Sequence, residues 1–155
     1  MLVIIRGPLG IGKSTVAKEI AKKLNAEYAS VDKILENKKL DTIDKKLGKI
    51  PLKKFLLANK AILDMKNTNL VIDGNFYYKE QIEDLIKKSR NCKVFTLKAP
   101  LEECIRRDKL RKKSLGEKAT KEVYNLASSF GYGTIINTEN KTPNQVIKLI
   151  IKNLK

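Results

Sequence analysis

The chain has 155 residues and is 42% hydrophobic, which is enough apolar material for one globular domain with its own core. It contains no histidine, so an imidazole base is excluded, and Cys92 and Cys104 lack the spacing of zinc ligands. The formal net charge is +16, yet all but five of the 33 basic residues are lysines dispersed along the chain. Dispersed lysines mainly solvate a surface, so this charge allows a nucleic-acid partner without requiring one.

Hydrophobic patterning predicts strands that alternate with helices from one end of the chain to the other. The predicted strands are short apolar runs at residues 2–5, 27–30, 70–72, 93–98 and 134–136. The predicted helices cover residues 13–24, 31–37, 51–65, 79–89, 100–114, 117–130 and 143–154. Residues 41–48 carry no clear pattern, and residues 67–69 are expected to break the chain before the third strand. This order predicts one three-layer α/β/α domain over residues 1–155, built on a five-stranded parallel sheet.

No apolar run approaches the roughly 18 residues that a membrane-spanning helix needs. The apolar start, Met1–Ile5, is too short for the core of a signal peptide. We therefore expect no membrane insertion, a location in the cytoplasm and two reduced cysteines.

A phosphate-binding motif follows the first predicted strand. Residues 7–14 read Gly-Pro-Leu-Gly-Ile-Gly-Lys-Ser, which matches G-x-x-x-x-G-K-S, and an amphipathic helix follows as the motif requires. Glycines let successive main-chain amides point at one centre, where the start of the helix favours an anion. Lys13 can reach the β- and γ-phosphates and the Ser14 hydroxyl can ligate Mg²⁺, so we expect a nucleoside triphosphate with Mg²⁺. The expected nucleotide-binding residues here are Gly7, Pro8, Leu9, Gly10, Ile11, Gly12, Lys13, Ser14 and Thr15.

The sequence disfavours a GTPase of the Ras type. Asn140-Lys141 is followed by Thr142-Pro143, so the aspartate of a guanine-reading N-K-x-D motif is missing. Asp73-Gly74 likewise lacks the two-residue spacing of a D-x-x-G switch.

The third predicted strand ends in an acidic residue. Residues 70–78 read Leu-Val-Ile-Asp-Gly-Asn-Phe-Tyr-Tyr, and an aspartate at such a strand tip can hold a Mg²⁺-bound water. Asp73 is therefore the second predicted metal residue. The next residues lie at the carboxyl edge of the sheet, where open α/β folds bind ligands, so Asn75 and Tyr77 are predicted to contact the substrate. The alternative is a turn whose aromatic side chains only cap the core.

Three of the five arginines, Arg106, Arg107 and Arg111, lie close together, although lysine serves nearly everywhere else. This clustering indicates planar, bidentate recognition of an anion rather than charge alone. Arg107 and Arg111 are spaced i, i+4, so we expect them on one face of a helix. The alternative is a solvated face with the helix pairs Glu103–Arg107 and Glu102–Arg106.

Through these segments the chain resembles, over nearly its full length, the small P-loop kinases of the nucleoside-monophosphate-kinase-like fold. The resemblance points to the branch of polynucleotide kinases, zeta toxins and adenylylsulfate kinases. It implies a P-loop NTPase fold with sheet order 2-3-1-4-5 and a short arginine-rich lid at about residues 106–118. It also implies ATP as the donor and lid arginines that stack on the adenine or meet the phosphates, which adds Arg106 and Arg107 to the nucleotide-binding residues.

In that branch an aspartate just after the second strand faces the acceptor hydroxyl, and Asp32 in Tyr28-Ala29-Ser30-Val31-Asp32 matches that position. A carboxylate there could orient and deprotonate an alcohol in line with the γ-phosphate. The alternative role is an N-cap for the helix at 33–37. The resemblance thus implies an ATP- and Mg²⁺-dependent kinase for a small hydroxyl acceptor, such as a metabolite or a 5′-hydroxyl of a nucleotide or polynucleotide. The catalytic residues would be Lys13, Asp32, Arg107 and Arg111.

Three other functions stay open on the sequence alone. An adenylate-kinase-like enzyme would phosphorylate a nucleoside monophosphate, although the motif after the third strand differs from that group. An RNA-associated NTPase would show RNA-stimulated hydrolysis that weakens with salt and leaves no phosphorylated product. A nucleotide-binding module would be stabilised by Mg-ATP without any turnover.

Overall fold

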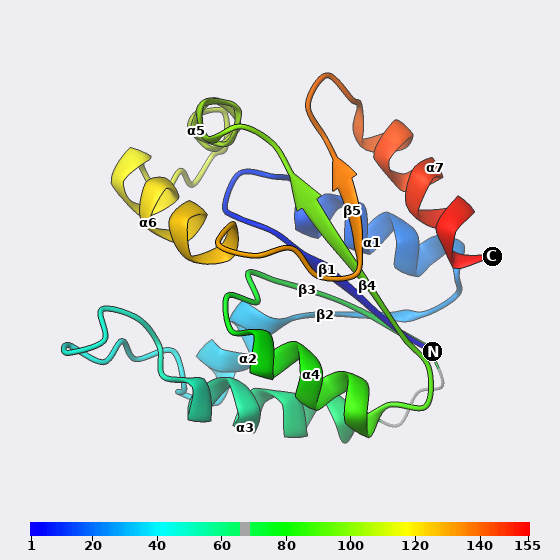
Figure 1. The fold of residues 1–155 in the computed structure, drawn as a ribbon, viewed down its shortest axis with the longest axis horizontal. Coiled ribbons are helices and arrows are strands. Elements are labelled where there is room, and N and C mark those ends of the chain that lie inside the picture. The colour runs from blue at the N-terminus through cyan, green and yellow to red at the C-terminus, as the bar shows by residue number, and fades with distance from the viewer. Residues whose placement is uncertain (66–68) are drawn as a thin grey trace.

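The computed structural model describes residues 1–65 and 69–155, in which strands and helices alternate as the sequence predicts (Figure 1). The predicted break at 67–69 therefore lies mostly outside the described residues. The strands are β1 (Leu2–Arg6), β2 (Glu27–Ser30), β3 (Leu70–Gly74), β4 (Cys92–Lys98) and β5 (Thr134–Asn137). The helices are α1 (Lys13–Lys23), α2 (Val31–Asn37), α3 (Leu52–Leu63), α4 (Lys79–Lys88), α5 (Leu101–Lys109), α6 (Glu117–Ala127) and α7 (Pro143–Leu154).

Within the described residues the five strands form one parallel sheet in the order β2-β3-β1-β4-β5, which confirms the predicted order. Strands β1 and β3 lie in its interior and every residue in them is buried, as expected for parallel strands covered on both faces. The register pairs Ser30 with Asp73 and Arg6 with Gly74. The segments that follow β1, β2 and β3 therefore begin at the same edge of the sheet.

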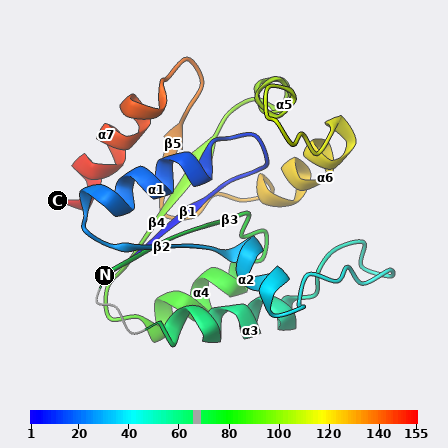
Figure 2. The same ribbon diagram turned by 180° about the vertical axis from the view of Figure 1, so that it is seen from behind.

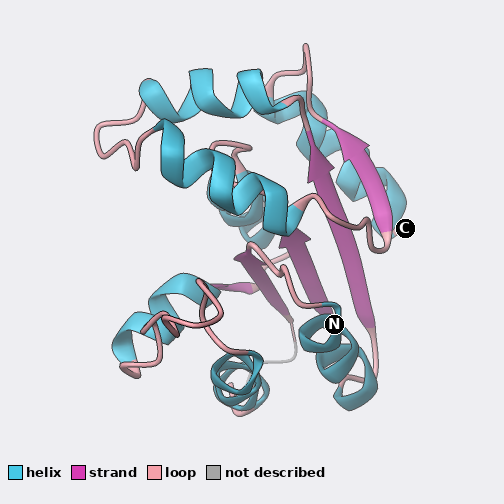
Figure 3. Ribbon diagram, turned by 60° about the vertical axis from the view of Figure 1, so that its left-hand side comes forward, coloured by secondary structure: helices cyan, strands magenta, loops and turns pink. Residues whose placement is uncertain are grey.

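Helices cover both faces of the sheet (Figure 3). Figure 2 shows α1 and α7 side by side along one face, and α3 and α4 together along the other. Alternation along β1 explains the two cores, because Val3 and Ile5 pack in the α1 and α7 core while Leu2 and Ile4 pack in the opposite one. No described helix is both long and apolar enough to cross a membrane.

Two helices, α5 and α6, end three or more residues earlier than predicted. Helix α5 ends at Lys109, because the buried carboxylate of Asp108 accepts hydrogen bonds from the Leu115 and Gly116 amides and turns the chain back. Helix α6 ends at Ala127, whose carbonyl oxygen accepts a hydrogen bond from the Arg6 guanidinium at 2.6 Å. The prediction that Arg111 lies on the helix of Arg107 is therefore wrong, since Arg111 follows the end of α5. Residues 41–48, which carried no pattern, form a loop closed by a bridge between Asp44 and Lys49.

Candidate active site

The phosphate loop joins β1 to α1 through residues that adopt positive φ. Gly10 has φ 76° and Gly12 has φ 94°, a region in which residues with a Cβ are strained. Gly12 is the N-cap of α1 and no side chain caps that end, so the first amides of the helix are open to a ligand. A Cβ on Gly10 would collide with the carbonyl oxygen of Cys104, so α5 packs directly on this loop.

Lys13 is the first residue of α1 and is 8% exposed. Its Nζ donates a hydrogen bond to the carbonyl oxygen of Pro8 at 2.7 Å, so the side chain folds back over the loop. Burial lowers the pKa of the lysine, and the nearby Asp32 and Asp73 carboxylates offset only part of this decrease. A lysine at a helix N-terminus is suited to bind a polyanion such as a triphosphate.

One cavity of about 300 Å³ collects most of the predicted site residues. They come from the phosphate loop and the start of α1, from the start of α2, from the end of β3 and from the region of α5. Its lining consists of Leu9, Gly10, Gly12, Lys13, Ser14, Thr15, Asp32, Asp73, Arg107 and Arg111. The structure thus brings the predicted phosphate, metal and catalytic residues to one place, because the carboxyl ends of parallel strands meet at one edge.

Asp73 is 2% exposed at the end of β3, and its Oδ2 accepts a hydrogen bond from the Tyr28 hydroxyl at 2.6 Å. Burial and the bond to Asp73 raise the pKa of the Tyr28 phenol to about 12, whereas hydrogen bonding with the Ser14 and Ser30 hydroxyls acts the other way. Sequence reasoning missed Tyr28. The signal was its place on β2, two residues before Ser30, which pairs with Asp73 in the sheet.

The residues present suit a Mg²⁺ ion. Among the described residues, no group of three or more histidine, cysteine or acidic side chains is placed to hold a metal ion. Mg²⁺ beside a nucleotide needs no such group, since one or two protein oxygens, water and the phosphates suffice. The Ser14 hydroxyl and the Asp73 carboxylate, lining one cavity, are donors of that kind.

Asp32 lies in the first turn of α2. The predicted alternative, that it caps this helix, is wrong, because the N-cap is Ser30 and no side chain makes a cap hydrogen bond. Its carboxylate stays open to solvent within the cavity. Enough protein still surrounds it that burial raises its pKa, which Lys13 opposes. No capping role for this carboxylate thus competes with a role in chemistry.

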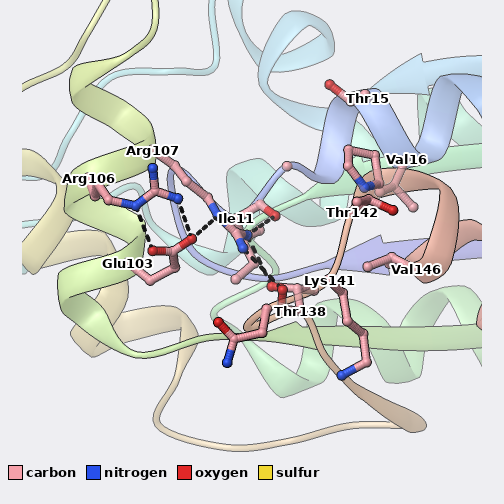
Figure 4. A pocket seen from close by; sticks show the side chains of 13 residues that line it. Ile11, Thr15, Val16, Glu103, Arg106, Arg107, Thr138, Lys141, Thr142 and Val146 are labelled. Carbon is pink, nitrogen blue, oxygen red and sulfur yellow. Dashed lines mark hydrogen bonds and ion pairs between the residues drawn. The ribbon is translucent and has the colours of Figure 1, made fainter.

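Arg107 stands between this cavity and a larger one of about 660 Å³, and lines both. Its Nε donates to Glu103 at 2.7 Å, and Nη1 donates to the Thr138 hydroxyl at 3.1 Å and to the Ile11 carbonyl at 3.3 Å. Its Nη2 donates to the Thr138 carbonyl at 3.1 Å. Figure 4 shows the side chain reaching from α5 towards Ile11 and Thr138. It therefore ties α5 to the phosphate loop and to the loop after β5.

The larger cavity lies between α5, the start of α1 and the loop that leads into α7 (Figure 4). Arg106 borders it and is bound through Nε and Nη2 to Glu103 at 2.8 and 2.7 Å. Hydrogen bonds from Arg106 and then Arg107 hold the pKa of Glu103 down to about 2. Arg106 thus pairs with Glu103 rather than Glu102, so of the two ion pairs in the alternative interpretation the described residues form Glu103–Arg107. Arg111, half exposed, forms an ion pair with Asp108 at 3.5 Å.

Asn75 and Tyr77 do not line either cavity. Phe76 is 1% exposed with φ 47°, so the alternative, in which aromatic side chains cap the core, describes this residue. Tyr77 is half-buried, and its ring meets the ring of Phe55 edge-on at 5.2 Å between centroids. The side-chain oxygen of Asn75 is buried without a hydrogen-bond partner among the described residues. Substrate contact by Asn75 and Tyr77 stays a prediction.

Comparison with known proteins decides the family. A family model described as an AAA domain matches residues 3–126. The chain belongs to this family. This AAA domain is 26% identical to a protein of Pyrococcus abyssi named provisionally as an adenylate kinase, over 100% of the chain and 84% of that protein. It is 28% identical to a shikimate kinase of Sulfurihydrogenibium sp., over 99% of the chain and 97% of that protein.

The fold also matches a solved structure, an unliganded sugar kinase from Janibacter sp. HTCC2649, with a TM-score of 0.81. The match covers 99% of this chain and 93% of that chain at 15% identity. Because kinases are similar to this chain over nearly its whole length, the predictions of a P-loop small-molecule kinase family and of a phosphotransferase are confirmed.

Proposed function

We propose that the chain transfers the γ-phosphate of ATP to a hydroxyl group of a small molecule, with Mg²⁺. The observation that carries this proposal is the position of the Asp32 carboxylate, which opens into the same cavity as Lys13 and the start of α1. A nucleotide held by the loop amides would present its terminal phosphate there. A cytoplasmic location is part of the proposal, since ATP is the assumed donor.

Each lining residue has a role in this proposal. The loop amides and Lys13 bind the phosphates, and Lys13 stabilises charge that develops in the transition state. Ser14 and Asp73 would hold Mg²⁺, which when bound neutralises charge on the β- and γ-phosphates. Asp32 orients the acceptor hydroxyl and accepts its proton. Arg107 and Arg111 border the transfer site and exclude water from it.

The relatives leave the acceptor open, since one is named an adenylate kinase and another a shikimate kinase. Asp32 favours an alcohol. A carboxylate facing the transfer site repels an anionic phosphate acceptor, whereas it accepts a hydrogen bond from a neutral hydroxyl. We therefore propose an alcohol, with nucleoside monophosphates as the competing class.

The test is transfer of labelled γ-phosphate from ATP to a panel of sugars, small cyclic alcohols, nucleosides, 5′-hydroxyl oligonucleotides and nucleoside monophosphates. Asp32→Asn should lower the transfer rate at least about 100-fold, the usual contribution of a general base. Glu36→Gln is the matched control, because it removes an exposed carboxylate from the same helix α2. Labelling of a monophosphate alone, or hydrolysis stimulated by RNA with no labelled product, would refute the proposal.

A further inference from the structure

Tyr28 reaches the candidate metal site from the edge strand of the sheet. Its ring is half-buried against the core formed by α1 and α7, and the Lys18 amine lies 5.5 Å from the ring centroid. Its hydroxyl ends 2.6 Å from Oδ2 of Asp73, which is the buried acid of the cavity. Tyr28 itself does not line that cavity. The side chain therefore acts on the site only through a neighbour.

We infer that Tyr28 is a positioning residue for Mg²⁺, which fixes the Asp73 carboxylate and thereby sets the affinity of the site for the ion. This inference rests on the proposed function, because it takes Ser14 and Asp73 as the groups that hold the metal.

The physical reason is the strict geometry of the ion. Mg²⁺ demands near-octahedral coordination and keeps several of its waters, so a carboxylate that serves it must hold one orientation. The Tyr28 hydroxyl donates a hydrogen bond to Oδ2 of Asp73 and so restricts the orientation of the carboxylate that would serve the ion. Outer groups that orient a ligand in this way typically account for about 10- to 100-fold in metal affinity. The Tyr28 ring packs against the core formed by α1 and α7, and this packing holds the hydroxyl in place beside Asp73.

The position also links the two metal-holding groups. Ser14 is the second residue of α1, while Asp73 is the last but one residue of β3, so the two come from separate segments of the chain. Tyr28 lies on β2, beside β3, and packs on the same face of the sheet as α1. It therefore bridges the strand that carries the acid and the helix that carries the hydroxyl.

The test measures binding rather than activity. Calorimetry of ADP at a series of Mg²⁺ concentrations gives the metal concentration at which half of the Mg²⁺-dependent gain in ADP affinity is reached. Tyr28→Phe keeps the ring and removes only the hydroxyl, and should raise that concentration about tenfold while ADP affinity in EDTA stays unchanged. Tyr124→Phe is the matched control, since it also removes one phenol hydrogen bond, at 3.1 Å to the Ala99 carbonyl, and does not line the cavity.

A second background separates positioning from general support of the fold. In Asp73→Asn protein, Tyr28→Phe should cause little further loss, because the phenol acts through that carboxylate. An unchanged Mg²⁺ requirement in Tyr28→Phe would overturn the inference, and so would an equal loss of ADP affinity with and without Mg²⁺. If the wild-type protein itself gained no ADP affinity from Mg²⁺, the metal site of the proposed function would fail instead.

Discussion

The turn that carries Arg111 depends on one buried carboxylate. Asp108 is 1% exposed and accepts hydrogen bonds from the Ser114 hydroxyl at 2.7 Å, the Leu115 amide at 3.1 Å and the Gly116 amide at 3.2 Å. Asp108→Asn keeps the size of the side chain and removes its charge. The three donors then face a neutral acceptor, and the new amide lies beside the Arg111 guanidinium.

The magnitude follows from those three bonds. A hydrogen bond to a charged group contributes about 1.5–3 kcal/mol and a neutral one about 0.5–1.5 kcal/mol, so each bond loses about 1 kcal/mol. Because Ser114, Leu115 and Gly116 are exposed, hydrogen bonds to water offset part of the lost bond energy, and we expect the free energy of unfolding to fall by about 2 kcal/mol. For a chain of this length the melting temperature should fall by about 4–8 °C.

The assay is thermal and denaturant unfolding of both proteins over a range of pH. Burial tends to raise the pKa of Asp108, but hydrogen bonds from Ser114, Gly116 and Leu115 and the charge of Arg111 lower it overall. A lowered folded-state pKa gives stability that is present above the unfolded value of about 3.9 and is lost as the pH falls through the folded value. The gap between the proteins should therefore be full at neutral pH and close in strong acid.

Asp41→Asn is the control, because it neutralises an exposed aspartate between α2 and α3. A neutral-pH difference below about 0.5 kcal/mol, the usual size of a surface effect, would refute the reasoning. A gap that persisted unchanged into strong acid would refute it as well.

Three further outcomes are expected. Lys13→Ala should lower the rate of phosphate transfer at least about 100-fold while the melting temperature stays unchanged. The control Lys23→Ala, at the exposed end of α1, should leave the transfer rate unchanged. Retained turnover in Lys13→Ala would contradict the role assigned to Lys13. Gly10→Ala should cost about 2 kcal/mol or more in a denaturant titration and weaken ATP binding, because it combines a strained φ with a collision against Cys104. The acid limb of the kcat/KM profile should lie above the ordinary pKa of an aspartate, because burial raises the pKa of Asp32 and only its carboxylate form accepts a proton. A limb at or below that ordinary value would exclude Asp32 as its source.

The sequence predicted those parts of the site that follow from local pattern and sheet topology. Periodicity located the strands and the phosphate loop, and the resemblance to P-loop kinases supplied the strand order. Once β1, β2 and β3 are parallel neighbours, the side chains that follow them must meet at one edge. Lys13, Asp32 and Asp73 could therefore be placed together before any contact was known.

Contacts made across the fold were not readable in the same way. Tyr28 and Asp108 have ordinary positions in a strand and a helix, and only packing shows which acid or amide each one meets. The end of α5 was missed for the same reason. Residues 110–113 carry no strong helix breaker, and the helix stops because the Asp108 side chain competes for the amides that follow.

The arginines show what composition can and cannot reveal. Arginine supplies several donors in a rigid fork, so it replaces lysine where several oxygens must be met at once. Arg6 shows this use of several donors outside the site. It is fully buried and donates hydrogen bonds to the Phe76, Ala127 and Phe130 carbonyls. Clustering alone therefore cannot separate a structural arginine from a ligand-binding one.

A structural arginine differs from a ligand-binding one in how many of its N–H donors already have partners within the protein. The donors of Arg107 are largely taken up by Glu103, Ile11 and Thr138, and Arg106 is held by Glu103. Arg111 lines the smaller cavity, which also contains Lys13 and Asp32, and its side chain is held, among the described residues, by the ion pair with Asp108. Most of its donors are thus left for a ligand. Arg107 lies between the two cavities and is fixed by these bonds, so we propose Arg111 as the arginine that binds a phosphoryl group during transfer.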